Sequence, residues 1–225
     1  MGEIMSFNSF SEAALSFYPN LRKSGYTTKA YNESKIIYKD CVKPEMMELL
    51  EYISHSLESN IPSLSYDSSQ DLGHPHPQGG AAKYAWGAIT RKGKTKHTDL
   101  QFYVALRFDY LRFGIYTKNE KKSQNIFNEI YRKINNNKTE FLEMIDALES
   151  KGIFITTKIS NDESGKPKPL VLRRDFPADT ILHDGTFNVM TAIPIEELPN
   201  INVGDAVVDA FMKIVPLYRF VLSLD

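Results

Sequence analysis

The chain has 225 residues, a net charge of −1 at neutral pH and a hydrophobic content of 42%, which suit one large soluble domain with an ordinary core. No apolar run approaches the roughly 20 residues that a membrane-spanning helix requires, and residues 1–10 lack the basic and apolar regions of a signal peptide. Cys41 is the only cysteine, which excludes an intrachain disulfide and a cysteine-based zinc site. We therefore expect a cytoplasmic protein that does not engage a membrane.

The first 60 residues have a helical pattern. Residues 11–25 predict a short helix that ends near Pro19 or Gly25, because both residue types terminate helices. Residues 29–60 predict a longer helical stretch that Pro44 divides, since proline is tolerated in the first turn of a new helix. The second half of this stretch carries apolar residues at spacings of four, three and four, which predict one buried face. This face consists of Met46, Leu50, Ile53 and Leu57.

Residues 61–80 are rich in Pro, Gly, Ser and Asp and show no hydrophobic period. A stretch of about 20 residues without secondary structure is uncommon inside a compact domain, and it is usually functional or disordered. We therefore expect a long flexible loop between the helical region and the strands that follow.

Alternating apolar and polar residues predict three strands next, over 83–90, 100–108 and 111–117. The last two are separated only by Asp109 and Tyr110, so they are expected to pair as a hairpin with a tight turn. Side chains of a strand point alternately to opposite faces of the sheet. One face of the first hairpin strand carries Leu100, Phe102, Val104, Leu106 and Phe108. The other face carries Gln101, Tyr103, Ala105 and Arg107.

The remaining residues predict more helices and strands. Helices are expected over 120–134 and 138–150, and a long C-terminal helix over 202–224. The apolar face of the C-terminal helix consists of Val203, Val207, Phe211, Ile214, Tyr218 and Val221. Strands are expected over 153–159, 170–176 and 186–195. This order predicts an α+β fold, in which residues 1–225 form a single domain and a twisted, mainly antiparallel sheet is packed by N-terminal and C-terminal helices.

The near-neutral total charge conceals a strong local excess. Residues 83–138 hold 13 Lys and Arg against four Asp and Glu, so this segment carries +9 and the remainder of the chain −10. Within it, "RKGKTKH" places cations around Gly93, which permits a tight bend. The charge excess could serve solubility or pack against the acidic remainder of the chain, and the loop could be a solvated turn; alternatively, a loop of this kind contacts phosphates. We expect a phosphate-binding loop formed by Arg91, Lys92, Lys94, Lys96 and His97.

Aromatic residues accompany these cations. If the hairpin forms as expected, its less apolar face presents Tyr103, Arg107, Arg112 and Tyr116, and Trp86 lies on the preceding strand. Such a face could stack nucleic-acid bases and hold backbone phosphates. The alternative is that helices cover this face and the tyrosines lie at the edge of the core.

Motifs for other chemistry are weak. The chain contains no G-x-x-x-x-G-K-[ST], G-x-G-x-x-G, H-E-x-x-H or G-x-S-x-G sequence. His74 and His76 could share a metal ion with His97 or His183, but prolines flank them and a polar loop accounts for them as well. Asp184, beside His183, could act in acid–base catalysis, although Asp-Gly more often marks a turn. We expect no metal and no other cofactor.

The chain resembles a widespread bacterial family of conserved hypothetical proteins, a domain of unknown function. Its first motif, Tyr-x-x-x-(Lys/Arg)-x-x-Tyr leading to Pro-Met, is matched by Tyr31, Lys35, Tyr38, Pro44 and Met46. Its basic segment Lys-x-Pro-Tyr-Lys-Thr-His is matched by "KGKTKHT", which lacks the Pro-Tyr. Its C-terminal Pro-Leu helix is matched by Phe211, Pro216, Leu217 and Phe220. The resemblance implies no assigned activity.

Residues 100–120 are also similar in pattern to the central strands of the N-terminal DNA-binding domains of McrB-type restriction proteins. This resemblance implies recognition of a modified base, which those domains read in an aromatic pocket.

Together these observations predict a nucleic-acid-binding module without catalytic activity. DNA is the expected partner ahead of RNA, within a restriction or defence system, either as a homo-oligomer or in a larger restriction complex. Two alternatives stay open. One is a small-molecule enzyme with its site under the 61–80 loop, involving His74, His76, His97 or Asp184. The other is a protein-interaction module whose acidic and basic halves associate.

Overall fold

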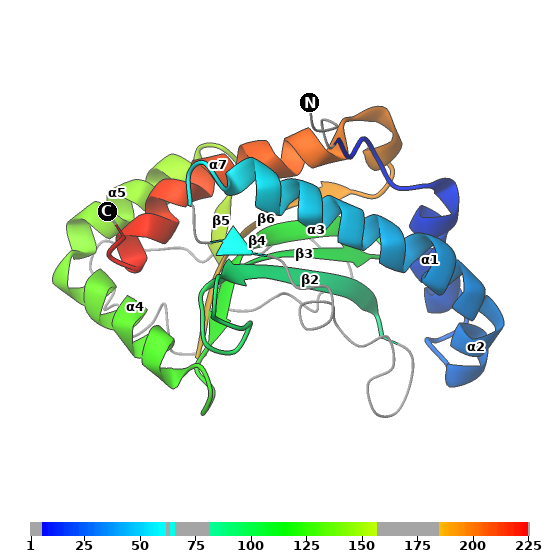
Figure 1. The fold of residues 1–225 in the computed structure, drawn as a ribbon, viewed down its shortest axis with the longest axis horizontal. Helices are drawn as coiled ribbons and strands as arrows, with labels where there is room; N and C mark the ends of the chain where they lie inside the picture. Colours follow the sequence, from blue (N-terminus) through cyan, green and yellow to red (C-terminus); the bar gives the residue numbers. More distant parts are fainter. Residues whose placement is uncertain (1–5, 62–63, 66–81, 157–184, 225) are drawn as a thin grey trace.

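A computed structural model describes residues 6–61, 64–65, 82–156 and 185–224 of the chain. The described residues form a mixed structure with one antiparallel sheet and helices packed against it (Figure 1). None of the helices in these ranges is long and apolar enough to cross a membrane. The predicted α+β class is confirmed.

The sheet contains six strands in the described residues, in the order β1-β2-β3-β4-β6-β5, and each neighbouring pair is antiparallel. The strands are β1 (Leu64–Ser65), β2 (Tyr84–Arg91), β3 (Gln101–Arg107), β4 (Tyr110–Lys118), β5 (Phe154–Thr156) and β6 (Thr186–Pro194). The late strand β6 lies between β4 and β5, so the sheet brings together segments that are far apart in the sequence.

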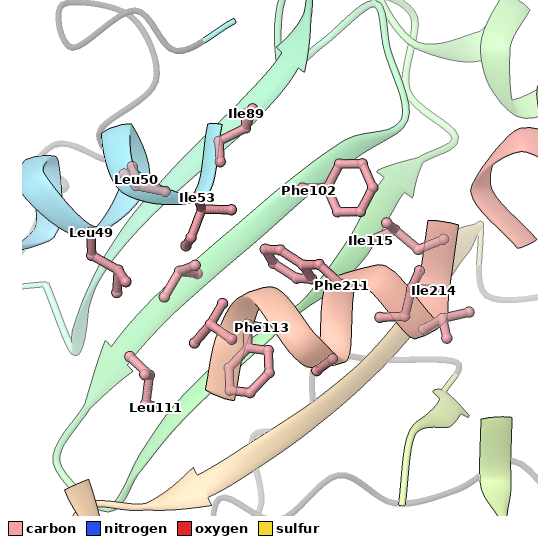
Figure 2. Packing of buried hydrophobic residues seen from close by; sticks show 14 of the residues in the cluster. Leu49, Leu50, Ile53, Ile89, Phe102, Leu111, Phe113, Ile115, Phe211 and Ile214 are labelled. Atoms are coloured by element: carbon pink, nitrogen blue, oxygen red, sulfur yellow. The ribbon is translucent and has the colours of Figure 1, made fainter. Parts of the chain in front are cut away.

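The helices are α1 (Glu12–Lys23), α2 (Thr28–Ile37), α3 (Lys43–Leu57), α4 (Gln124–Asn136), α5 (Lys138–Glu149) and α7 (Val203–Val221). α3 and α7 lie over one face of the sheet (Figure 1). Phe211 of α7 packs between Phe102 of β3 and Phe113 of β4, with ring centroids 5.0 and 5.9 Å apart respectively (Figure 2). The predicted apolar faces of α3 and α7 are therefore confirmed as part of the core.

Of the two proline expectations, the one at Pro19 needed correction. α1 continues through Pro19 and ends at Lys23, where Gly25 adopts a left-handed φ of +68°, so the predicted stop at Pro19 is wrong and the one near Gly25 is confirmed. The division of the second helical stretch at Pro44 is confirmed: α3 begins at Lys43 with Pro44 in its first turn, and the residues before it form a π-helical turn over Tyr38–Val42. A proline ring clashes with the carbonyl four residues earlier, and a wider turn accommodates it while the helix continues.

The hairpin between β3 and β4 forms as expected, with its turn one residue earlier. Leu106 pairs with Leu111, which leaves Phe108 and Asp109 as the two-residue connection rather than Asp109 and Tyr110. The Arg107 Nε donates to the Asp109 Oδ1 at 3.2 Å across this turn. A two-residue shift in pairing preserves which side chains face the core, so the predicted alternation along β3 is confirmed.

The expectation of a loop without secondary structure over 61–80 is wrong at two residues. Leu64 pairs with Arg91 and Ser65 with Thr90, which adds β1 to the edge of the sheet. Ile61 and Leu64 are buried against the core, and this burial gives the segment an apolar anchor that its polar composition hides. The rest of the expected loop, and the strand expected over 170–176, lie outside the described residues.

Gly114 occupies a crowded backbone position in the sheet. It lies in the middle of β4, opposite Tyr103 of β3 and Met190 of β6. A Cβ atom built on Gly114 would overlap the carbonyl oxygen of Val189 and approach the Met190 Cα at 2.7 Å. Because both neighbours are backbone atoms, no side-chain movement can make room, so only glycine fits between β3 and β6.

We predict that Gly114→Ala lowers the free energy of unfolding by about 3 kcal/mol, the upper part of the usual cost of overpacking. The matched control is Gly93→Ala, whose new Cβ would meet no atom within 4 Å and whose only penalty is its φ of +78°, about 1 kcal/mol. Urea denaturation measures both values. Equal losses of unfolding free energy in the two variants would show that β4 can move away from β6 without a cost in stability, and would contradict the steric role of Gly114.

Candidate functional site

A pocket of about 480 Å³ opens on the face of the sheet opposite α3 and α7. β3 turns Gln101, Tyr103 and Ala105 to this face, because the residues between them pack into the core. β2 and β4 contribute their own alternate side chains. Among the described residues, the lining consists of Tyr84, Trp86, Gln101, Tyr103, Ala105, Arg107, Arg112, Tyr116, Lys118 and Thr186.

The pocket exists because its floor carries a small residue among large ones. Ala105 pairs with Trp86 on one side and with Arg112 on the other. Its methyl group cannot fill the space between an indole and a guanidinium, and this row of the sheet is therefore hollow. Arg112 is fully buried, which places its positive charge at the base of the hollow.

Tyr103 forms a fixed wall of the pocket. Its cross-strand partner is Gly114, which has no side chain, so the tyrosine ring extends across β4 to β6. There its hydroxyl donates to the Asn188 Oδ1 at 3.2 Å, and the Asn188 Nδ2 donates to the Thr156 Oγ1 at 2.7 Å. The ring of Tyr116 meets that of Tyr103 edge-on, with centroids 6.1 Å apart. These contacts hold the aromatic wall in one orientation.

Burial raises the pKa of the Tyr103 phenol above that of an ordinary tyrosine, and the nearby charge of Arg112 offsets this shift only in part. The pKa of Tyr116 is raised as well, again mainly by burial. Both side chains are therefore neutral at physiological pH and present apolar rings with polar tips to the pocket.

The charge of the pocket lining is positive. Arg107, Arg112 and Lys118 belong to it, and none of the lining residues that the structure describes is acidic. Carboxylates outside the lining lie close to these cations: Arg107 binds Asp109 at 3.2 Å, Arg112 also acts on the Asp109 carboxylate, and Lys118 binds Glu120 at 2.6 Å. The Lys118 pair is half-exposed, so water and salt weaken it and leave the ammonium available to an anion.

The basic segment between β2 and β3 is a loop with a rigid base. Gly93 has a φ of +78°, and the Lys94 amide donates to the Arg91 carbonyl at 2.9 Å to close a tight turn. Arg91 reaches Asp99 through its Nε at 2.9 Å and its Nη2 at 2.6 Å, and its backbone amide donates to the same carboxylate at 2.8 Å. Asp99 is fully buried. This fork of bonds ties the two ends of the loop together.

The other cations of the loop are placed differently. Lys92, Lys94 and His97 are exposed. The Lys96 Nζ lies 5.2 Å from the centre of the Trp86 ring, which brings the loop to the rim of the pocket. The predicted loop and the predicted aromatic face therefore form one continuous surface.

Of the ten residues predicted for the site, Trp86, Tyr103, Arg107, Arg112 and Tyr116 line the pocket. The loop supplies the other five, of which Arg91 is engaged by Asp99. The prediction missed several pocket residues. Gln101 and Ala105 share the alternation of Tyr103 and could have been found from it. Thr186 lines the pocket and Asn188 lies behind the aromatic wall because of the register of β6. No local sequence pattern reveals that register.

The metal and acid–base candidates cannot be placed in the same way. His74, His76, His183 and Asp184 lie outside the described residues. Within the part of the chain that the structure describes, no group of three or more His, Cys, Asp or Glu residues is arranged to hold a metal ion.

We predict that Asp99→Asn lowers the free energy of unfolding by about 3 kcal/mol, because it leaves the partly buried Arg91 without its counter-charge. Glu120→Gln is the matched control, since it breaks an ion pair of the same length that is half-exposed; its cost should stay below about 1 kcal/mol. Chemical denaturation of both variants compares them, and similar losses would contradict an anchoring role for Asp99.

We also predict that Tyr103→Phe leaves the rise in tyrosinate absorbance between about pH 9 and 11 unchanged. The raised pKa of Tyr103 keeps its proton in the folded state beyond the range of an ordinary phenol. The stability linked to this neutral phenol is present below about pH 10 and is lost as the pH rises through the folded-state pKa. Loss of one tyrosine from the absorbance change, in a variant that circular dichroism shows to be folded, would mean that Tyr103 is accessible.

The comparisons with known proteins place the chain in a family without assigning it an activity. The model of a family described as conserved hypothetical protein, DUF2461, matches residues 82–220. The match covers more than half of the chain, including every residue that lines the pocket and nearly all of α7. The motif expected around Tyr31 and Pro44 lies outside it and stays a prediction, as does the likeness to McrB-type domains. A comparison with curated proteins finds no match. The chain belongs to the DUF2461 family of conserved hypothetical proteins.

Proposed function

We propose that the pocket face and the β2–β3 loop bind nucleic acid, with an unpaired nucleotide in the pocket and neighbouring phosphates on the loop. The observation that carries this proposal is the union of two features on one surface. An aromatic pocket, whose described lining holds three basic residues and no acidic one, adjoins a loop that exposes Lys92, Lys94 and His97.

The shape of the surface favours single strands or unpaired segments over an intact duplex. Duplex readers usually insert a helix or ribbon into a groove, whereas a sheet face with aromatic side chains stacks unpaired bases. A pocket of about 480 Å³ lies within the size range of small-ligand sites, ~300–1,000 Å³. Such a volume suits one base or nucleotide.

Each part of the surface has a distinct role in this proposal. Trp86 and Tyr116 offer ring faces and edges for stacking. Lys92, Lys94 and Lys96 supply point charges for phosphates, which give affinity without sequence information. Arg91 holds the loop in place through Asp99.

The predicted likeness to McrB-type domains is the reason to propose DNA ahead of RNA, and a restriction or defence system in which the chain works as a homo-oligomer or in a larger restriction complex. The binding test therefore includes both nucleic acids, and sedimentation at several protein concentrations reports self-association. Of the residues named for the enzyme alternative, His97 is the one that the structure describes, and it lies exposed beside the pocket rather than in its lining.

We predict that replacing Lys92, Lys94 and Lys96 by alanine weakens binding to single-stranded DNA and lowers the slope of log K against log salt by about 2, since each lost phosphate contact on a single strand accounts for about 0.7. The triple variant Lys29→Ala, Lys35→Ala and Lys39→Ala changes the net charge equally at exposed positions of α2 and the turn after it. Those residues are near the opposite end of the sheet from the loop. Tyr26, which shortly precedes α2, has the Lys83 ammonium over its ring, and Lys83 directly precedes β2, whereas the loop follows the other end of β2.

Fluorescence anisotropy over a salt series measures both slopes. An identical slope in the loop variant and the parent would remove the loop from the binding surface. Equal effects of the loop and α2 variants would reduce the attraction to net charge alone.

We further predict that Tyr116→Leu weakens binding by about 1–3 kcal/mol, the usual worth of one base–aromatic contact, and leaves the salt slope unchanged because no charge is lost. Tyr131→Leu on α4 is the control for the loss of a half-buried tyrosine away from the pocket lining. A changed slope, or equal weakening by the control, would speak against stacking in the pocket.

A further inference from the structure

Among the described residues that line the pocket, Gln101 is the one with a buried side-chain polar atom that has no hydrogen-bond partner. The side chain lines the pocket and is only 3% exposed. Its Oε1 is buried and accepts no hydrogen bond. A buried acceptor without a donor is destabilising, and most buried polar groups in folded proteins are paired.

The surroundings of Gln101 define what a donor would look like. Its cross-strand partner is Tyr116, whose ring meets Tyr103 edge-on. The amide therefore stands at the margin of an aromatic wall, where a flat ring stacked against that wall would present its edge. A primary amide offers an acceptor and a donor side by side, which complements a ring edge carrying an N–H next to an acceptor.

We propose that Gln101 binds the hydrogen-bonding edge of one unpaired nucleobase in this pocket, with its Oε1 accepting from a base N–H. This inference rests on the proposed function and deepens it, because it converts a stacking surface into a site that requires a base. Stacking and phosphate contacts bind any strand, whereas an unpaired acceptor rejects a ligand that cannot donate to it.

Ligand-free protein offers a first test of Gln101. Gln101→Met keeps the length of the side chain and removes the unpartnered polar group. If Gln101 serves only a ligand, this variant unfolds at a urea concentration equal to or above that of the parent. A lower midpoint would show that the amide already holds the fold together, and it would overturn the proposal.

The binding test uses a DNA duplex with one unpaired thymine at its centre. Two matched duplexes replace that thymine by an abasic site or by difluorotoluene, which has the shape of thymine but forms no hydrogen bonds of comparable strength. We expect the parent to prefer thymine to difluorotoluene by about tenfold, the effect of one hydrogen bond to a buried acceptor. Gln101→Met should bind the thymine and difluorotoluene duplexes equally and still prefer both to the abasic one.

Ala105→Leu is the second variant, because a larger side chain on the pocket floor excludes the base. This variant should bind each of the three duplexes with the affinity that the parent has for the abasic duplex. Its salt dependence should equal that of the parent. Discrimination that survives in Gln101→Met, or its absence in a parent that binds DNA, would overturn the role of Gln101 and leave nucleic-acid binding intact. Failure of the parent to bind any strand would overturn both proposals.

Free thymidine monophosphate separates the two sources of a base. If the free nucleotide competes only at concentrations far above those at which the bulged duplex binds, the result supports a pocket that takes a base within a strand. Binding as tight as that of the duplex, and lost in Gln101→Met, would assign the pocket to a free nucleotide and overturn the nucleic-acid function while keeping the base contact.

Discussion

The fold and the candidate site both depend on the burial of one face of β3. Phe102, Val104 and Leu106 are fully buried in the core, and Phe102 lies against Phe211 of α7 (Figure 2). Because side chains alternate along a strand, a slip of one residue would exchange the two faces of β3 completely and would bury its polar set. Burial of this face therefore also decides that Gln101, Tyr103 and Ala105 point to the opposite face of the sheet, although these side chains are not part of the main core.

A second constraint links the basic loop to the helical layer. The fully buried Asp99 engages Arg91 at the base of the loop, and its charge also acts on Tyr218 of α7. Burial is the main cause of the raised pKa of Tyr218, and the Asp99 carboxylate adds to it. The loop is thus held by a charged group inside the protein, and its exposed lysines extend from a base that the core positions.

The distribution of charge gives this surface its electrostatic character. Residues 83–138 carry +9 within a chain of net charge −1, and this segment holds the loop and every described lining residue of the pocket except Thr186. The N-terminal helical region packs near the hairpin end of the sheet, where the Arg22 guanidinium lies 3.8 Å from the Phe108 ring centre. A field set by the local excess, rather than by the total charge, acts on a ligand that approaches the loop.

The sequence by itself determined the features that repeat over a few residues. These local patterns are the alternation along β3, the apolar face of α7, the bend at Gly93 and the cationic character of 91–97. The folded chain preserves the first two because burial follows the period of a strand or a helix. The bend and the charges are properties of the loop residues themselves. Only the tertiary structure decided which distant residues meet. It placed Asn188 and Thr156 behind Tyr103, set Lys96 over Trp86, and paired Leu64 with Arg91. These contacts join strands or loops whose order in the sheet is set by the packing of the whole core, and such packing leaves no periodic trace in any single segment.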